Sequence, residues 1–386
     1  MRLSRILSML AGFFVALKLA LLIPTATPAA DAQVSGRQVL QKLVEEARKE
    51  GQLDIFGGQE VVGKTEQNLM QAFNKRFGLN IKVHVDNTTT EGPKFSQAML
   101  EHQTGLPPTF DAMQGAEDRV LLLQEAGVIQ RVDNWEALLR EISPEAFKAH
   151  KQLSPMGFGG FGFQWISRLK VINYNPTLIS KEELPQTRLE LGNPKYQGMY
   201  SLPPFVSEAL YGVLVYPKAQ WLETVKSWGK SKPPIIHYPE GIKRMLLGEL
   251  RFLLSNDYYY WDIKAKNPNA PIGISFFKDL TPMQFSFYFV RKGARHPSAA
   301  TLFSLWMATP EANRIFENPG IGTVQANLSL GTGPISRQIL EMVNKDKVKM
   351  VSWYDSEEAF NTFRWYTTKE GAAYARDLFK AQTGRE

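Results

Sequence analysis

The chain has 386 residues, no cysteine and a formal net charge of +7. Hydrophobic residues make up 44% and charged residues 22%, as in an ordinary globular protein, and the length allows two domains with separate cores. The absence of cysteine excludes disulfides, thiolate metal sites and a cysteine nucleophile. The positive excess is small and contains no dense Lys/Arg run, so no nucleic-acid partner is expected.

The N-terminus has the pattern of a secretory signal peptide. Two arginines precede an almost wholly apolar stretch over residues 6–17, Lys18 interrupts the longer span 6–23, and Ala30–Ala32 offers a small-x-small cleavage site. A bilayer-spanning helix needs about 20 apolar residues, which favours secretion over a membrane anchor. We therefore predict a signal peptide over residues 1–32, cleaved before Gln33, with no stable membrane insertion afterwards. Without a cysteine for lipid attachment, the predicted location is the periplasm.

The residues after the signal alternate between helical and strand patterns. Helices are predicted from apolar residues at spacings of three and four, and strands from short alternating or buried-type runs. The expected order is helix 39–47, strand 53–56, helix 69–77, strand 81–85, helix 95–101, strand 110–113 and helix 120–128. This rhythm predicts an α/β sheet with parallel strands.

Prolines end several of the predicted elements in the middle of the chain. A strand pattern over 169–172 leads into the turn 173–176, because Pro176 stops regular continuation. A helical pattern is expected between Pro176 and Pro185, and a short strand over 199–202 ends at two prolines.

The C-terminal part carries three further signals. Phe285, Phe287 and Phe289 alternate, which predicts a strand that leads the chain back toward its first part. Thr309 before Pro310 has the chemistry of a helix start. The tail from Ser336 onward is expected to be mostly helical and amphipathic.

These pieces, in this order, resemble bacterial extracellular solute-binding proteins of ABC importers, close to the ferric-iron-binding branch. The stretches that carry the resemblance are 46–53, 73–83, 173–176, 193–204 and 256–261. The resemblance implies an α/β, two-lobed periplasmic-binding-protein fold of type II, with two lobes joined by crossing hinge strands and a ligand held between them. The implied boundaries are 33–168 plus 276–318 for lobe I, 177–270 plus 319–386 for lobe II, and hinges near 169–176 and 271–275.

The implied function is capture of a small solute and its delivery to an ABC transporter permease. Such a protein has no catalytic step, so no enzyme activity is expected. It needs no cofactor beyond Fe(III) as a transported ligand, and a monomer is expected. The resemblance leaves two ligand classes open, namely ferric iron and a small organic or phosphorylated anion.

For iron, the resemblance points to the tyrosines before Trp261. In the ferric branch, two adjacent tyrosines that precede a tryptophan supply phenolate oxygens to Fe(III), which matches Tyr259 and Tyr260 here. A hard trivalent cation favours anionic oxygen, so this donor set is chemically sensible. The family often has a histidine where this chain has Glu60, whose carboxylate becomes the third expected metal ligand.

The other expected ligand contacts come from loops that the family places around its cleft. Side-chain donors of the family's anion-binding loop are missing from residues 204–207, where backbone amides remain. Together with Glu60 and with Glu117, which matches the family's carboxylate only with a one-residue shift, this departure supports a small organic or phosphorylated anion nearly as well as iron. The full expected contact set is Gly58, Gln59, Glu60, Gly115, Glu117, Tyr174, Phe205, Val206, Ser207, Tyr258, Tyr259 and Tyr260.

A competing motif is the phosphate-loop pattern from Gly58 to Thr65. Gly58, Gly63, Lys64 and Thr65 have the spacing that cradles nucleotide phosphates and binds magnesium. Export to a compartment without ATP, and the lack of a convincing second metal-binding aspartate, argue against it. A nucleotide-binding protein is therefore the less favoured alternative.

Overall fold

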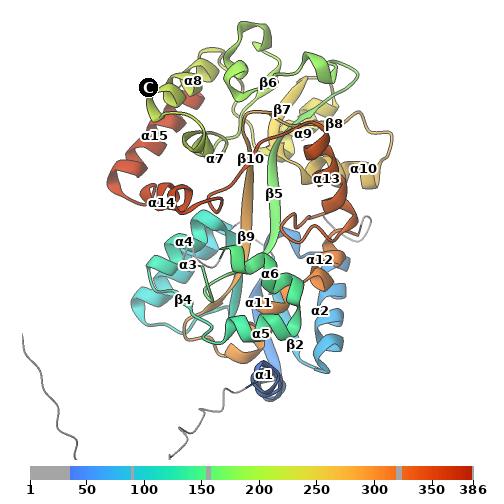
Figure 1. The fold of residues 1–386 in the computed structure, drawn as a ribbon, viewed down its shortest axis with the longest axis vertical. Coiled ribbons are helices and arrows are strands. Elements are labelled where there is room, and N and C mark those ends of the chain that lie inside the picture. Colours follow the sequence, from blue (N-terminus) through green and yellow to red (C-terminus); the bar gives the residue numbers. More distant parts are fainter. Residues whose placement is uncertain (1–34, 88–90, 154–157, 319–323, 385–386) are drawn as a thin grey trace, which may run out of the picture. The chain divides into compact units, whose positions relative to one another are not determined.

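The computed structural model describes residues 35–87, 91–153, 158–318 and 324–384 (Figure 1). The predicted signal peptide and its cleavage site lie outside these residues. In the described ranges, no helix is both long enough and apolar enough to cross a membrane.

A ten-stranded mixed sheet organises the described chain. Its main path runs in the order β2-β1-β3-β9-β5-β7-β6, while β4 and β10 pair with β9 and β8 pairs with β5. The strands are β1 Gln52–Phe56, β2 Lys82–Asp86, β3 Ala112–Ala116, β4 Ile129–Gln130, β5 Phe163–Tyr174, β6 Tyr200–Ser201, β7 Phe252–Asn256, β8 Gly273–Ser275, β9 Thr281–Arg291 and β10 Met350–Val351.

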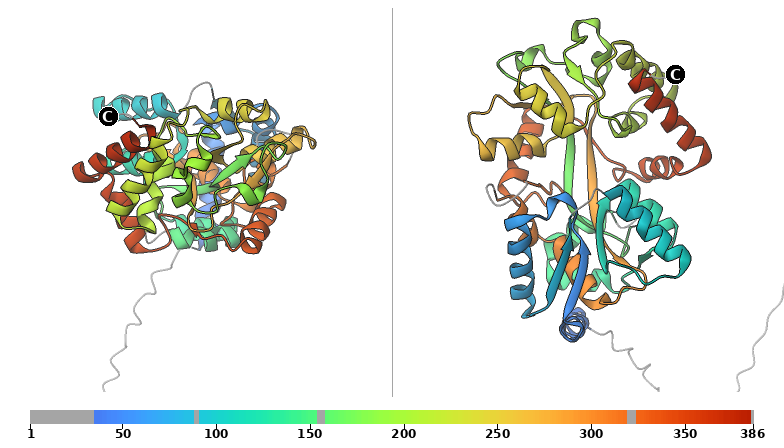
Figure 2. Two further views of the ribbon diagram at one scale, coloured as in Figure 1. Left: turned by 90° about the horizontal axis from the view of Figure 1, so that it is seen from above. Right: turned by 180° about the vertical axis from the view of Figure 1, so that it is seen from behind.

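Two long strands connect the two groups of elements in the sheet. β5 and β9 pair in antiparallel register from Phe163 opposite Tyr288 to Leu169 opposite Met283, with a bulge between Gln164 and Ile166. At one end, β9 pairs with β3, which pairs in parallel with β1; at the other end, β5 pairs with β7. Figures 1 and 2 show β5 and β9 side by side between the elements drawn below and above them, called here the lower and upper groups.

Helices cover the sheet in both groups. Those of the lower group are α1 Gly36–Glu50, α2 Gly63–Phe77, α3 Glu91–Thr104, α4 Glu117–Glu125, α5 Trp135–Ile142, α6 Pro144–Leu153, α11 Pro297–Met307 and α12 Pro310–Phe316. Those of the upper group are α7 Ser207–Leu210, α8 Lys218–Lys230, α9 Tyr238–Leu246, α10 Tyr258–Lys266, α13 Pro334–Lys345, α14 Glu357–Trp365 and α15 Lys369–Thr383. The chain also forms 3-10 turns: η1 Gly58–Glu60, η3 Lys181–Glu183, η4 Arg188–Gly192, η5 Pro194–Tyr196 and η6 Tyr211–Leu214.

Local chemistry explains where several helices begin and end. Ser35 forms a capping box with Gln38 at the start of α1, and Gly51 ends this helix in the left-handed conformation at φ 67°. The Thr309 side chain accepts a hydrogen bond from the Ala312 amide, which confirms the predicted start of α12. The predicted strand through Phe285, Phe287 and Phe289 and the mostly helical tail are also confirmed.

One predicted element is wrong. The helical pattern expected between Pro176 and Pro185 forms only the short turn η3. Ser180 is extended at ψ 162° and caps the turn, and Leu184, the residue before Pro185, is extended at ψ 155°, so only Lys181–Glu183 are left for a helical turn.

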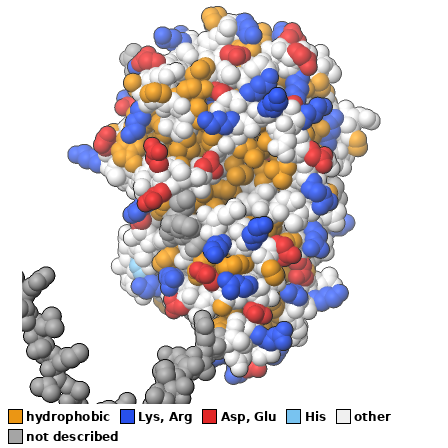
Figure 3. Space-filling view, in the orientation of Figure 1, with side chains coloured by type: hydrophobic (Ala, Val, Ile, Leu, Met, Phe, Trp, Pro, Cys, Tyr) orange, Lys and Arg blue, Asp and Glu red, His pale blue; other side chains and the backbone are white. Residues whose placement is uncertain are grey.

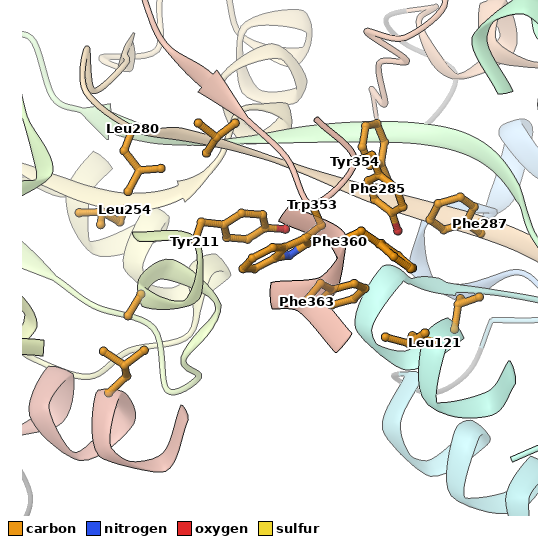
Figure 4. Close-up of a cluster of buried hydrophobic side chains, with 14 of the residues drawn as sticks. Leu121, Tyr211, Leu254, Leu280, Phe285, Phe287, Trp353, Tyr354, Phe360 and Phe363 are labelled. Atoms are coloured by element: carbon orange, nitrogen blue, oxygen red, sulfur yellow. The ribbon is translucent and has the colours of Figure 1, made fainter. Parts of the chain in front are cut away.

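Apolar clusters lie on both sides of the sheet. In the lower group, Trp135, Phe163, Phe303 and Trp306 belong to a buried cluster that also includes strand and helix residues from β1 and α2. A second cluster includes Phe285 and Phe287 of β9 together with aromatic residues of the upper group (Figure 4). There, Tyr211 stacks on Trp353 with ring centroids 4.6 Å apart, and Trp353 stacks on Phe363 at 5.4 Å.

Figure 3 shows one face of the molecule. Apolar side chains gather across the middle of this face, and Lys, Arg, Asp and Glu side chains are scattered above and below it. The charged side chains are of mixed sign, in keeping with the small net charge of the sequence.

Candidate functional site

A cavity of about 380 Å³ brings together residues that are far apart in sequence. Gly58, Gln59 and Glu60 enter it from η1, directly after β1, and Phe205 enters from the segment between β6 and α7. Its full lining is Gly58, Gln59, Glu60, Glu91, Gly92, Gln114, Arg119 and Phe205. Ligand sites of α/β sheets commonly lie beyond the carboxyl ends of parallel strands, as the η1 side of this cavity does.

Four of the predicted contact residues, Gly58, Gln59, Glu60 and Phe205, therefore line one cavity. A larger cavity of about 690 Å³ between α8 and α15 contains none of the predicted residues. That cavity is lined by Leu222, Lys226, Gly229, Lys230, Lys232, Asp377, Lys380, Ala381 and Gly384. We therefore take the smaller cavity as the candidate site.

Gly58 lets the loop after β1 lie close to β3. Its φ is +64°, and a Cβ atom here would lie 2.2 Å from Nε2 of Gln114. Any side chain would collide with Gln114 and would be strained in this backbone conformation. The glycine therefore fixes the distance between the η1 loop and the floor of the cavity.

Glu60 forms an ion pair with Arg168 of β5. Nη2 of Arg168 lies 2.5 Å from Oε1 of Glu60, and Nε of Arg168 donates to Oε1 of Gln325 at 3.2 Å. Arg168 is only 9% exposed, so its contacts hold the guanidinium in place beneath the cavity loop. A fixed positive charge thus neutralises the carboxylate that was predicted to bind a metal.

The three consecutive tyrosines occupy the start of α10 and face different surroundings. The Tyr258 and Tyr259 rings stack with centroids 4.2 Å apart, and the Arg168 guanidinium carbon lies 5.9 Å from the Tyr258 ring. Tyr260 instead meets Trp261 edge-on at 4.9 Å and packs against two apolar clusters. Successive residues on a helix point about 100° apart, so all three cannot face one site.

Burial raises the pKa of the Tyr258 and Tyr259 phenols above their ordinary value. Both hydroxyls are therefore protonated at neutral pH and act as hydrogen-bond donors. The pair beside Arg168 is Tyr258 and Tyr259, whereas the sequence pointed to Tyr259 and Tyr260.

Glu91 and Gln114 form the floor of the cavity. Nε2 of Gln114 donates to Oε1 of Glu91 at 3.3 Å and lies 3.5 Å from Oε2 of Glu60. Burial raises the pKa of Glu91 to about 7, and the nearby Glu60 carboxylate adds to the shift while Arg168 opposes it.

Gly115 and Glu117 are packed into the protein beside β9. Gly115 pairs with Phe287, and a Cβ atom there would lie 2.4 Å from the Phe95 ring. The buried Glu117 carboxylate accepts hydrogen bonds from the Tyr211 hydroxyl and from the Phe285 amide, the latter at 3.2 Å. Neither residue is in the cavity lining. Burial raises the pKa of Glu117 to about 8, although both hydrogen bonds lower it.

The remaining predicted contacts lie in the upper group. Tyr174 ends β5 against Gly273, where a Cβ atom would meet its ring at 2.4 Å. Val206 is the N-cap of α7 and Ser207 its first residue, but this helix has only four residues. The neighbouring Phe205 ring meets Tyr238 edge-on at 5.0 Å. Of this loop, only Phe205 lines the cavity.

Sequence reasoning missed Glu91, Gln114, Arg119 and Arg168. A visible signal was the presence of two cations, Arg168 and Lys170, within the strand pattern of β5, because buried cations in strands are rare unless they are paired. Nothing in the local sequence marks Glu91 or Gln114.

The phosphate-loop pattern does not form a nucleotide cradle around this cavity. Lys64 is exposed and lies on the first turn of α2, and it is not among the cavity-lining residues. The first residues of the motif form the 3-10 turn η1 instead.

One group of side chains has atoms placed as metal ligands could be. Asp54, Asp111 and His296 offer atoms that all lie within 4.8 Å of one another. However, Asp111 already accepts hydrogen bonds from the backbone amides of Asp54, Arg295 and His296 and lies 2.7 Å from Nδ1 of His296. Asp111 therefore links β1 to the start of α11.

Comparisons with known proteins agree with this architecture. Residues 68–335, more than half of the chain, match the family model described as bacterial extracellular solute-binding protein. A search of curated protein sequences finds no match.

Solved structures of similar fold include several iron-binding proteins. Iron-bound HitA from Pseudomonas aeruginosa is 19% identical, with a TM-score of 0.60, covering 85% of this chain and 99% of that one. The Trichodesmium protein FutA, in complex with iron and citrate, is 19% identical with a TM-score of 0.62, covering 87% and 100%. A substrate-binding protein of an Agrobacterium tumefaciens ABC transporter is 15% identical with a TM-score of 0.62, covering 87% and 97%. At these identities the likeness shows the two-lobed fold alone.

Proposed function

Because this chain belongs to the bacterial extracellular solute-binding protein family, we propose that it is the periplasmic substrate-binding component of an ABC importer. It captures a small solute in the cavity between η1 and Phe205 and delivers it to the permease. The family consists of binding proteins, so delivery requires no catalytic step.

In this proposal the lower and upper groups act as the two lobes. Lobe I comprises 33–168 and 276–318, lobe II comprises 177–270 and 319–386, and the hinges lie near 169–176 and 271–275. β5 and β9 run between the groups, which supports closure as a hinge motion. Export after removal of residues 1–32 belongs to the same proposal.

The ligand we propose is a small organic solute with an acidic group. The observation that carries this is the ion pair of Arg168 with Glu60, beside Tyr258. The guanidinium neutralises the Glu60 carboxylate, so this carboxylate attracts a metal cation less than an unpaired one would. Arg119 lines the cavity and supplies a cation for the acidic group, whereas Tyr258 and Tyr259 lie beside Arg168 and are not among the lining residues.

Ferric iron is the second candidate. The stacked pair of Tyr258 and Tyr259 and the iron in the HitA and FutA structures favour it. Iron binding would require both phenols to lose their protons and Glu60 to leave Arg168. The metal set from the sequence, Glu60 with Tyr259 and Tyr260, would also require Tyr260 to leave Trp261.

A spectrum and elemental analysis of protein purified without chelator separate these candidates. We expect a colourless protein without iron that takes up none from ferric citrate, and an acidic small molecule in the mass spectrum of the co-purified material. Replacing Tyr258 or Tyr259 with Phe removes one neutral hydrogen bond, so the affinity for this molecule should fall by about 1 kcal/mol at most. Tyr260→Phe is the matched control.

A coloured, iron-loaded protein would reverse the order of the candidates. Its phenolate-to-iron charge-transfer band should then be lost in Tyr259→Phe and in one neighbouring tyrosine variant. Which neighbour matters would also decide between the pair beside Arg168 and the pair indicated by the sequence.

A further inference from the structure

One corner of the cavity is rich in hydrogen-bond acceptors. It is formed by Glu60 at the end of η1, Glu91 at the start of α3 and Gln114 in the middle of β3. We call this set the acceptor corner. The amide nitrogen of Gln114 lies within 3.5 Å of both carboxylates, so the three side chains converge on a small volume.

Gln114 has an acceptor that the described protein does not use. The residue is 0% exposed, and among the described residues its Oε1 atom has no hydrogen-bond partner. A buried carbonyl oxygen without a donor is unfavourable and uncommon in a native protein. Because Gln114 lines the cavity, a bound molecule can supply the missing N–H group.

Glu91 also has no cationic partner within the described chain. Within the described chain it accepts hydrogen bonds from the Gln114 side-chain amide and from the Ala116 backbone amide at 3.5 Å, both neutral donors. The nearby guanidinium of Arg168 is engaged by Glu60 instead. The corner therefore offers two carboxylates and one amide carbonyl, against a single arginine that already has a partner.

We propose that the solute is zwitterionic, with a protonated nitrogen held in the acceptor corner and its acidic group directed toward Arg119. This inference rests on the proposed function, because it concerns the solute held in the same cavity. An ammonium, amidinium or guanidinium group carries several N–H donors, which suits three converging acceptors.

Arg119 also lines the cavity and is a cation outside the acceptor corner. The Arg119 side chain is about half exposed and pairs with the neighbouring Asp118 at 3.8 Å, so it can reorient toward a ligand.

The test uses the exported chain and a defined mixture of small molecules. The mixture contains the proteinogenic amino acids, di- and polyamines, C2–C6 carboxylates, hexose phosphates and ferric citrate at equal concentrations. After equilibrium dialysis, mass spectrometry identifies what the protein retains. We expect retention of a compound that has both a basic nitrogen and an acidic group.

The Glu91→Gln variant then tests whether the basic nitrogen of the retained compound binds in the acceptor corner. Loss of a charge-assisted hydrogen bond should weaken binding of the retained zwitterion on the order of tenfold or more, measured by calorimetry. Glu136→Gln, on the exposed surface of α5, is the matched control and should bind as the parent protein does. Circular dichroism and the melting temperature of the ligand-free variants establish that both are folded.

Three outcomes overturn the inference in distinguishable ways. Retention of an acid without a basic nitrogen, or of the ferric complex, removes the zwitterion but leaves a solute-binding protein. A zwitterion bound equally well by folded Glu91→Gln removes the acceptor corner as its site. Retention of nothing removes the proposed function as well.

Discussion

Two buried glutamates, Glu208 and Glu117, have almost the same exposure but opposite surroundings. Glu208 is 0% exposed, with Nη2 of Arg188 at 3.3 Å, Nζ of Lys170 at 4.0 Å and the Tyr238 hydroxyl as a donor. Glu117 is 1% exposed, and it accepts hydrogen bonds from two neutral groups, the Tyr211 hydroxyl and the Phe285 amide.

Glu208 therefore has a structural role, whereas Glu117 is expected to respond to pH. Around Glu208, the two cations supply the charge that compensates for burial, so the carboxylate braces α7 against β5 and η4. Around Glu117, hydrogen bonds lower the pKa but burial outweighs them and holds it at about 8. Compensation by a full charge, rather than the number of hydrogen bonds, distinguishes the two regions.

The largest expected effect comes from removing the charge in the first region. Glu208→Gln leaves Arg188 and Lys170 buried without their counter-charge, which should lower the free energy of unfolding by about 3–5 kcal/mol. Urea denaturation at pH 7 measures it. The control is Glu223→Gln, which breaks an exposed ion pair with Lys226 and should cause no measurable change. A loss no larger in Glu208→Gln than in this control would contradict the comparison.

The second region should respond to pH instead. The pKa of Glu117 is about 8 in the folded protein against an ordinary 4.5, so the native state binds the proton more tightly than the unfolded chain. Glu117 therefore stabilises the folded state fully below about pH 4.5, and this stabilisation is lost as the pH rises toward 8. Between pH 5 and 8 this loss should amount to roughly 2–4 kcal/mol.

Glu117→Gln keeps the shape of the protonated side chain and cannot ionise. The variant should therefore lose stability less steeply over this pH range, measured by urea denaturation at several pH values. Glu91 and Asp257, whose pKa values burial raises to about 7, remain in both proteins and cancel in the difference. Parallel stability curves for variant and parent would show that Glu117 does not titrate here.

His150 extends the comparison to a buried group that, among the described residues, has no hydrogen-bond partner at either ring nitrogen. Burial lowers the pKa of His150 from 6.5 to about 4. Protonation therefore favours the unfolded chain, so the free energy of unfolding decreases as the pH falls from about 6.5 to about 4. His150→Phe should remove roughly 1–2 kcal/mol of the destabilisation between pH 7 and 5. Melting curves at both pH values measure this, and an unchanged pH dependence would contradict it. The ring packs between Trp135 and Phe163, which can accept Phe.

Much of the fold could be predicted because its signals are local. The cap of Thr309, the alternation of Phe285 to Phe289 and the helix–strand rhythm before residue 130 each depend on neighbours within a few residues. The failed helix before Pro185 shows the limit of such signals. There the pattern favoured a helix, whereas the Ser180 cap and the extended residue before Pro185 limit it to one short turn.

The candidate site likewise has features that the sequence predicted and others that only the tertiary structure decided. The sequence by itself determined the family's order of elements, the loop at Gly58–Glu60 and a tyrosine-rich segment after β7. Only the tertiary structure decided that Tyr258 and Tyr259 face Arg168 while Tyr260 does not, since this depends on how α10 is rotated against β5. It also brought Glu91 and Gln114 to Glu60, across sequence separations of 31 and 54 residues. Contacts across such separations depend on sheet pairing and burial, which no local pattern encodes.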